Sequence, residues 1–233
     1  ASMQLEAIGA RAVPILRAGL NNPSLEVRFH SAIALTYLNE RDGIRTLINA
    51  ARDEPAFRVF AFAALAASEE PEVSLQLREL LHEASAETRY GAWRALTIAD
   101  RRDPLVRGEN ISDEFKFHVL NTNGPPMVHL TNRKKAEIVL FGSDQRFQTP
   151  LALRAGNDVL ITAAEGSDQV TVARYEVGKP DRRKRVSLRV ADVIRAVAEL
   201  DATYPDIAQM LAQADKQHNI PGTIELDAVP QSG

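Results

Sequence analysis

The segment VRFHSAIAL at residues 27–35 recurs as FRVFAFAAL at residues 57–65 and as TRYGAWRAL at residues 88–96. Each copy has an arginine at its second position, a small residue three positions later and an Ala-Leu pair at its end. The arginines advance by 30 and then 31 residues. A period of about 20–50 residues is typical of helical repeats, whose units bury their apolar faces against their neighbours. The first hundred residues are therefore predicted to form stacked helical units.

A second helix is predicted in each unit, because apolar residues recur there at the spacing of one helix face. The residues are Val13, Leu16 and Leu20 in the first unit, Ile44, Leu47 and Ala51 in the second, and Val73, Leu77 and Leu80 in the third. Proline-containing breakers at residues 21–23, 53–55 and 69–71 separate the helices.

The segment NPSLEVR at residues 22–28 and its counterparts resemble the short HEAT-like repeat family, the type also found in phycobilisome-lyase proteins. The resemblance covers residues 7–100, although the third unit has Ser85 and Ala86 where the family usually has proline. It implies an N-terminal α-solenoid over residues 1–105. Such a fold presents a surface for binding, and it does not by itself imply an activity.

The recurring arginines Arg28, Arg58 and Arg89 form a predicted ladder with two interpretations. They are a stripe that binds a partner, or they are structural residues that pair with acids of a neighbouring unit, such as Asp53 or Glu83. We favour the structural interpretation, because an arginine near a helix start in this family usually forms an ion pair between units.

From residue 110 the pattern changes to short alternating segments, which predict a second domain over residues 110–233. Strands are expected at residues 115–119, 127–130, 137–141, 158–162, 169–175 and 185–188, separated by Gly, Asn, Asp and Pro turns. This β-rich part, residues 113–188, is predicted to be a small, mainly antiparallel sandwich or partly closed barrel. Helices are expected within residues 190–217, followed by a last strand at residues 223–226. The fold class is therefore α+β.

Composition excludes several functions. The net charge of −3 from 28 basic and 31 acidic residues is evenly spread, so we predict no nucleic-acid partner. The longest apolar run, residues 59–67, is far shorter than the roughly 20 residues that span a bilayer, so no membrane insertion is expected. There is no cysteine, no phosphate-binding glycine loop and no nucleophile elbow. We predict no enzyme activity, no catalytic residue, no metal and no cofactor.

Two polar features remain. His118 and His129 are expected to face each other across a hairpin, with Glu137 on the next strand, and this is the one arrangement that resembles a metal or acid-base cluster. Polar residues also alternate outward on any half-buried strand, which is the interpretation we favour. The run KPDRRKR at residues 179–185 is either a contact for phosphates or an acidic partner, or a solvated turn.

A second resemblance involves DPLVRGE at residues 103–109, GPPMVH at 124–129 and EIVLFGSDQR at 137–146. These segments resemble the C-terminal extension of large P-ring-like flagellar basal-body proteins. The resemblance implies a structural role in the cell envelope or periplasm, and without it the sequence leaves the compartment unknown.

The prediction is a non-catalytic scaffold that engages a protein partner through its repeat helices and the sheet edge. The alternative is a β domain that binds carbohydrate or a small ligand and is carried on a helical spacer. That alternative requires a cleft lined by aromatic residues such as Phe141, Phe147 or Tyr175.

Overall fold

The computed structural model describes residues 9–131 and 135–226, which divide into two compact units. The first unit extends to Val106, and the second begins at Arg107. The first is helical and the second contains both helices and sheets, so the chain is an α+β protein, as predicted. None of the helices in the described residues has the length and apolar composition needed to cross a bilayer.

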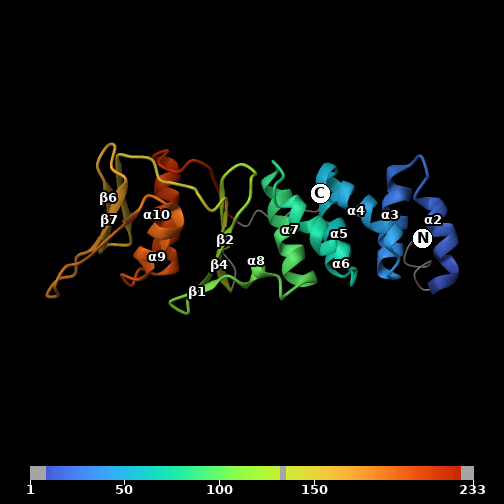
Figure 1. The fold of residues 1–233 in the computed structure, drawn as a ribbon, viewed down its shortest axis with the longest axis horizontal. Helices are drawn as coiled ribbons and strands as arrows, with labels where there is room; N and C mark the ends of the chain where they lie inside the picture. Colours follow the sequence, from blue (N-terminus) through green and yellow to red (C-terminus); the bar gives the residue numbers. More distant parts are fainter. Residues whose placement is uncertain (1–8, 132–134, 227–233) are drawn as a thin grey trace. The chain divides into compact units, whose positions relative to one another are not determined.

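The first unit consists of helices in two layers (Figure 1). The recurring segments form α3, α5 and α7, and α5 contacts both of the others. Helices α2, α4 and α6 form the second layer and pack against α3, α5 and α7, respectively. The elements are η1 (Gly9–Ala12), α2 (Val13–Gly19), α3 (Leu25–Tyr37), η2 (Arg41–Gly43), α4 (Ile44–Asp53), α5 (Pro55–Ala66), α6 (Pro71–Leu80) and α7 (Ala86–Ala99). A short helix, α8 (Pro104–Arg107), follows.

The helix starts follow from local sequence. The Ser24 hydroxyl accepts a hydrogen bond from the Val27 N–H, and the Ser85 hydroxyl accepts one from the Thr88 N–H, so that each serine satisfies a backbone donor of the first turn. A proline occupies the first turn of α2, α5 and α6, where a missing N–H costs little. These starts confirm the predicted positions of the breakers.

The second unit contains two sheets. A mixed five-stranded sheet has the order β1-β2-β4-β3-β9, and an antiparallel four-stranded sheet has the order β5-β6-β7-β8. The strands are β1 (Glu109–Ile111), β2 (Phe115–Leu120), β3 (Met127–Leu130), β4 (Ala136–Phe141), β5 (Leu151–Ala155), β6 (Val159–Ala163), β7 (Gln169–Arg174), β8 (Arg182–Ser187) and β9 (Thr223–Leu226). Two helices, α9 (Val190–Ala198) and α10 (Tyr204–Lys216), precede β9.

The two sheets do not form the predicted sandwich or barrel, because α9 and α10 lie between them (Figure 1). One buried cluster joins residues of both sheets, such as Phe117 and Ile161, to helix residues such as Ile194 and Met210. The five-stranded sheet is mixed, since β2 pairs with β4 and β3 pairs with β9 in parallel. The other strand pairs of the unit are antiparallel, so the β part is mainly antiparallel, as predicted. Strand alternation reports that one face is buried, but it does not report whether a sheet or a helix covers that face.

Candidate docking surface

Helix α5 exposes apolar side chains on its solvent side. Ala56, Phe60, Ala63 and Ala67, which caps the helix, are all exposed, and their spacing of three and four residues places them along one face. Phe60 is 50% exposed. None of the four side chains carries a polar group, so this face of α5 interacts with its surroundings only through apolar contact.

The opposite face of α5 is mainly apolar, with Arg58 as its one buried charged residue. Ala61, Phe62, Ala64 and Leu65 are buried, and the ring of Phe57 packs against that of Phe29 on α3, with 4.4 Å between the ring centroids. A helix with apolar residues on most of its circumference is typical of an element that is covered on several sides. Among the residues that the structure describes, the fold covers only one side of α5.

Large apolar residues lie on the two neighbouring helices at the height of the small residues of α5. In the repeat alignment, Ala67 corresponds to Tyr37 on α3 and to Ile98 on α7, which are 49% and 56% exposed. Because α3 and α7 both pack against α5, these side chains flank the α5 face. We call Tyr37, Phe60, Ala63, Ala67 and Ile98 the apolar stripe.

Helix α4 of the other layer differs from α5, whereas α2 and α6 of that layer each expose a large apolar side chain, Ile15 and Leu75, which are 66% and 59% exposed. The solvent side of α4 carries Arg45, Asn49 and Arg52, all exposed, and Arg52 forms an ion pair with Glu83 at 2.7 Å. Charged and amide groups on a solvent face remain hydrated, which is the ordinary condition of a surface helix. The exposed apolar face of α5 is therefore not shared by its neighbour α4.

At two of the three positions of the arginine ladder, the side chain donates hydrogen bonds to backbone carbonyl oxygens. Arg58 is 6% exposed and donates to the carbonyl oxygens of Ala51 at 2.9 Å and Arg52 at 3.2 Å. Arg28 donates to two carbonyl oxygens in the same way, those of Asn22 and Pro23, both at 2.8 Å. These carbonyls lie at or after the end of the preceding helix, where a helix leaves acceptors without a partner of its own.

Arg58 also pairs with an acid of the next unit, but with Glu87, at 2.7 Å, and not with Asp53 or Glu83. The side chain of Arg89 is buried, with 2% exposed. These positions accord with the structural interpretation of the ladder, while its role toward a partner stays a prediction.

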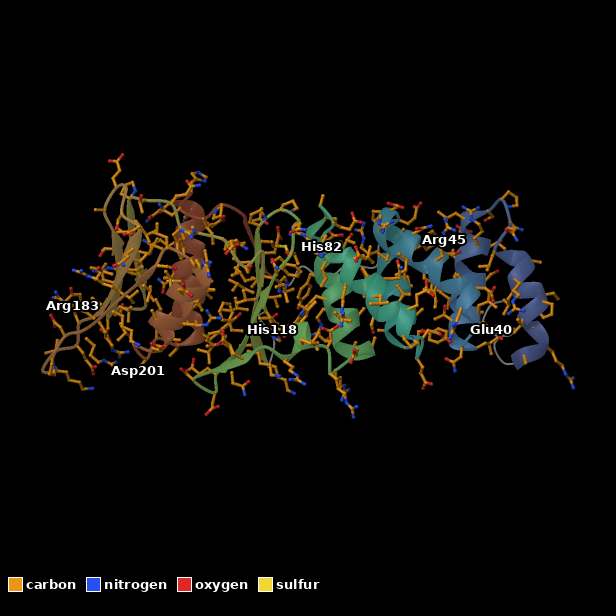
Figure 2. The ribbon with its side chains drawn as sticks, viewed as in Figure 1. Glu40, Arg45, His82, His118, Arg183 and Asp201 are labelled. Carbon is orange, nitrogen blue, oxygen red and sulfur yellow. The ribbon has the colours of Figure 1, made fainter. Side chains whose placement is uncertain are left out.

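The predicted cluster of His118, His129 and Glu137 is arranged differently. His118 lies on β2 (Figure 2) and His129 on β3, and both are in register with Val139 of β4, which separates them. The hairpin prediction was therefore wrong, because β3 pairs on the far side of β4. With strands about 4.8 Å apart, the two histidine backbones are roughly 10 Å apart.

The surroundings of these residues are packed. His118 and His129 are buried, with 3% and 0% exposed. Gly108, whose φ is +59°, lies so close to His118 that an added Cβ would be 2.5 Å from the ring. Glu137 accepts a hydrogen bond from the Thr131 hydroxyl at 3.2 Å. No group of three or more acids or histidines within the described residues is placed to hold a metal ion.

The aromatic residues named for a ligand cleft do not line one. Phe141 and Phe147 are buried, with 0% and 2% exposed, and only Tyr175 is open to solvent. A hollow of about 340 Å³ beside the β7–β8 hairpin is lined by charged groups and one proline, with no aromatic ring: Arg174, Glu176, Lys179, Pro180, Arg182 and Asp201. The observations therefore favour the apolar stripe as the candidate functional surface.

Neither a scan against protein-family models nor a search of curated proteins found a match to this chain.

Proposed function

We propose that the chain is a non-catalytic scaffold whose first unit is a short HEAT-like α-solenoid and docks a protein partner on the apolar stripe. The observation that carries the proposal is the apolar solvent face of α5. Aromatic side chains contribute much of the energy of protein interfaces when they enter a partner's pockets. Phe60 and Tyr37 are such side chains, and both are about half exposed.

The architecture supports this proposal. A repeat unit buries its apolar face against the next unit, and the remaining face is free for a ligand. Ion pairs between successive units, such as Arg41 with Glu70 at 2.6 Å and Arg58 with Glu87 at 2.7 Å, link the repeats. The second pair joins α5 to α7, and α3 also packs against α5, so the solvent faces of the three helices are adjacent.

Affiliation with P-ring-like proteins stays a prediction of the sequence resemblance, and it names a compartment in which to look for the partner. If it is right, the partner is a component of the cell envelope. The docking proposal does not depend on it, because the apolar stripe is exposed whatever the compartment.

Site-specific photocrosslinking in cells of the source organism tests the proposal. A benzophenone amino acid replaces Phe60 on α5 in one variant and Arg45 on α4 in a matched control. We expect a discrete protein adduct from position 60, absent at position 45, that disappears when Tyr37→Glu and Ile98→Glu are added. Equal adducts from both positions, no adduct at position 60, or an adduct that survives the two glutamates would each contradict docking on the stripe.

A further inference from the structure

The four-stranded sheet has one closed edge and one open edge. On β5, the Arg154 N–H points away from the sheet and donates to the side-chain oxygen of Gln213 on α10 at 2.9 Å. Near the start of β5, the Asn219 side chain donates to the carbonyl oxygens of Gln148 and Pro150 at 3.0 and 2.9 Å. The β5 edge is therefore covered by the fold, whereas β8 has only β7 as a neighbouring strand within the described residues.

The pattern of hydrogen bonds shows which groups of β8 point outward. The Tyr175 N–H donates to the Asp158 carbonyl, so the backbone groups of Tyr175 point toward β6. In an antiparallel ladder this direction alternates along the strand, so those of Arg174 point toward β8, where Arg174 is in register with Arg182. By the same alternation, Arg183, Arg185 and Ser187 direct their N–H and C=O groups away from β7. These groups have no hydrogen-bond partner among the described residues.

The side chains of β8 divide between two faces. Arg182 and Lys184 point toward the helices and pair with Asp201 and Glu199. Arg183 and Arg185 lie on the outer face of the sheet, beside the small residues Ala173 and Thr171 of β7.

The two outer arginines differ in their partners. Arg183 lies over the Tyr175 ring and contacts Asp181 at 3.1 Å. For Arg185, no acid pairs with it within the part of the chain that the structure describes, and its side chain is exposed. Figure 2 shows Arg183 on the projecting β7–β8 hairpin.

We propose that the open edge of β8 binds an acidic, extended segment of a partner protein, which adds a fifth strand to this sheet. The backbone of the segment would satisfy the outward groups of Arg183, Arg185 and Ser187, which is how sheet edges recognise extended peptides. Acidic side chains at alternate positions would face Arg183 and Arg185, since cross-strand pairs of opposite charge are favourable.

A second copy of the chain is the wrong occupant. Pairing β8 with β8 would bring arginines and lysines of the two strands together, and like charges in facing strands are destabilising. Charged residues on an edge strand protect it from neutral and basic strands. The same positive charges attract an acidic strand. This site is independent of the apolar stripe on the first unit.

The test uses a synthetic ten-residue peptide of alternating glutamate and threonine, with a lysine and threonine peptide as the control. We expect saturable binding of the acidic peptide alone. On binding, the amides of Arg183, Arg185 and Ser187 should become protected from hydrogen exchange, while those of Arg182, Lys184 and Val186, which already donate within the sheet, should change little. No saturable binding, or binding that leaves the three outward amides unprotected, overturns the proposal.

Three variants separate backbone pairing from charge. Arg185→Thr removes the charge and keeps the N–H, and we expect about 3- to 10-fold weaker binding. Arg185→Pro removes the outward N–H as well, at an edge position that tolerates proline, and should abolish binding. Arg154→Thr removes an arginine of the same outer face at the closed edge and should change nothing.

Equal loss from Arg154→Thr and Arg185→Thr would show general attraction to a basic surface and overturn strand addition. Binding to Arg185→Pro as tight as to Arg185→Thr would do the same. Self-association without peptide that protects the outward amides would identify a second copy as the occupant and overturn the acidic partner.

Discussion

Helix α5 and strand β8 both expose groups that a folded chain usually buries, but the exposed groups differ. A helix satisfies its own backbone hydrogen bonds, so α5 offers only apolar side chains such as Phe60. An edge strand offers unpaired backbone groups, and β8 surrounds them with charged side chains. On the two proposals, the α5 face would select its partner by apolar fit, whereas the β8 edge would select its partner by charge.

The sharpest contrast within α5 is between two phenylalanines. Phe62 is 6% exposed and Phe60 is 50% exposed. We expect Phe62→Ala to lower the free energy of unfolding by about 3–5 kcal/mol, because it removes a buried ring and leaves a cavity. Phe60→Ala should change it by less than about 0.5 kcal/mol. Urea unfolding followed by far-ultraviolet circular dichroism measures both, and similar losses would mean that the Phe60 side of α5 is also packed.

A second contrast concerns the arginines of the two layers. Arg58→Ala should cost about 2–3 kcal/mol of unfolding free energy, since it leaves the carbonyls of Ala51 and Arg52 without their charged donor. The ion pair with Glu87 adds little to this loss, because that carboxylate is 54% exposed. Arg45→Ala on the solvent side of α4 is the control, with an expected change within about 0.5 kcal/mol. Equal effects in the same urea titration would refute the capping role.

The sequence predicts the helices of the first unit well because each recurring segment carries its own apolar spacing and its own breakers. The repeat pattern does not predict the apolar stripe, because the residue types that recur between units lie at inward positions such as Ala61 and Leu65. Phe60 corresponds to His30 and Gly91, which share no chemistry. The signal was the uninterrupted apolar run at residues 59–67, because one face of an amphipathic helix does not need nine apolar residues in succession.

In the second unit, local patterns located most strands but not their order. The alternating segment LALRA of β5 was not predicted as a strand, although its burial alternates as a half-buried strand requires. The insertion of β3 on the far side of β4, and of two helices between the sheets, depends on contacts distant in sequence. The predicted proximity of His118 and His129 failed for this reason.

Removal of the charges should make β8 behave like an unprotected edge. Arg183→Val combined with Arg185→Val leaves the ladder with β7 intact and exposes an apolar strand with free backbone groups. We expect concentration-dependent self-association in sedimentation velocity, with a thermal midpoint within about 2 °C of the wild type at low concentration, as for a surface change. Arg154→Val at the closed edge is the matched control, and its sedimentation should be the same as that of the wild type. A double variant that does not associate would show that other features protect the edge.

The smallest expected effect separates the two faces of β8. Hydrogen bonding and charge from Arg182 hold the pKa of Asp201 below its ordinary value. A carboxyl whose pKa is lowered by folding stabilises the fold at pH values above its unfolded pKa, and this contribution is lost as the pH falls through the folded pKa. Arg182→Gln should therefore raise the pKa of Asp201, measured by NMR titration of its carboxyl carbon. Arg183→Gln removes a charge one residue away on the outer face and should leave that pKa almost unchanged. An equal rise in both variants would mean that the side chains of β8 do not alternate between the helix face and the open face, and the assignment of its outward backbone groups would fail with it.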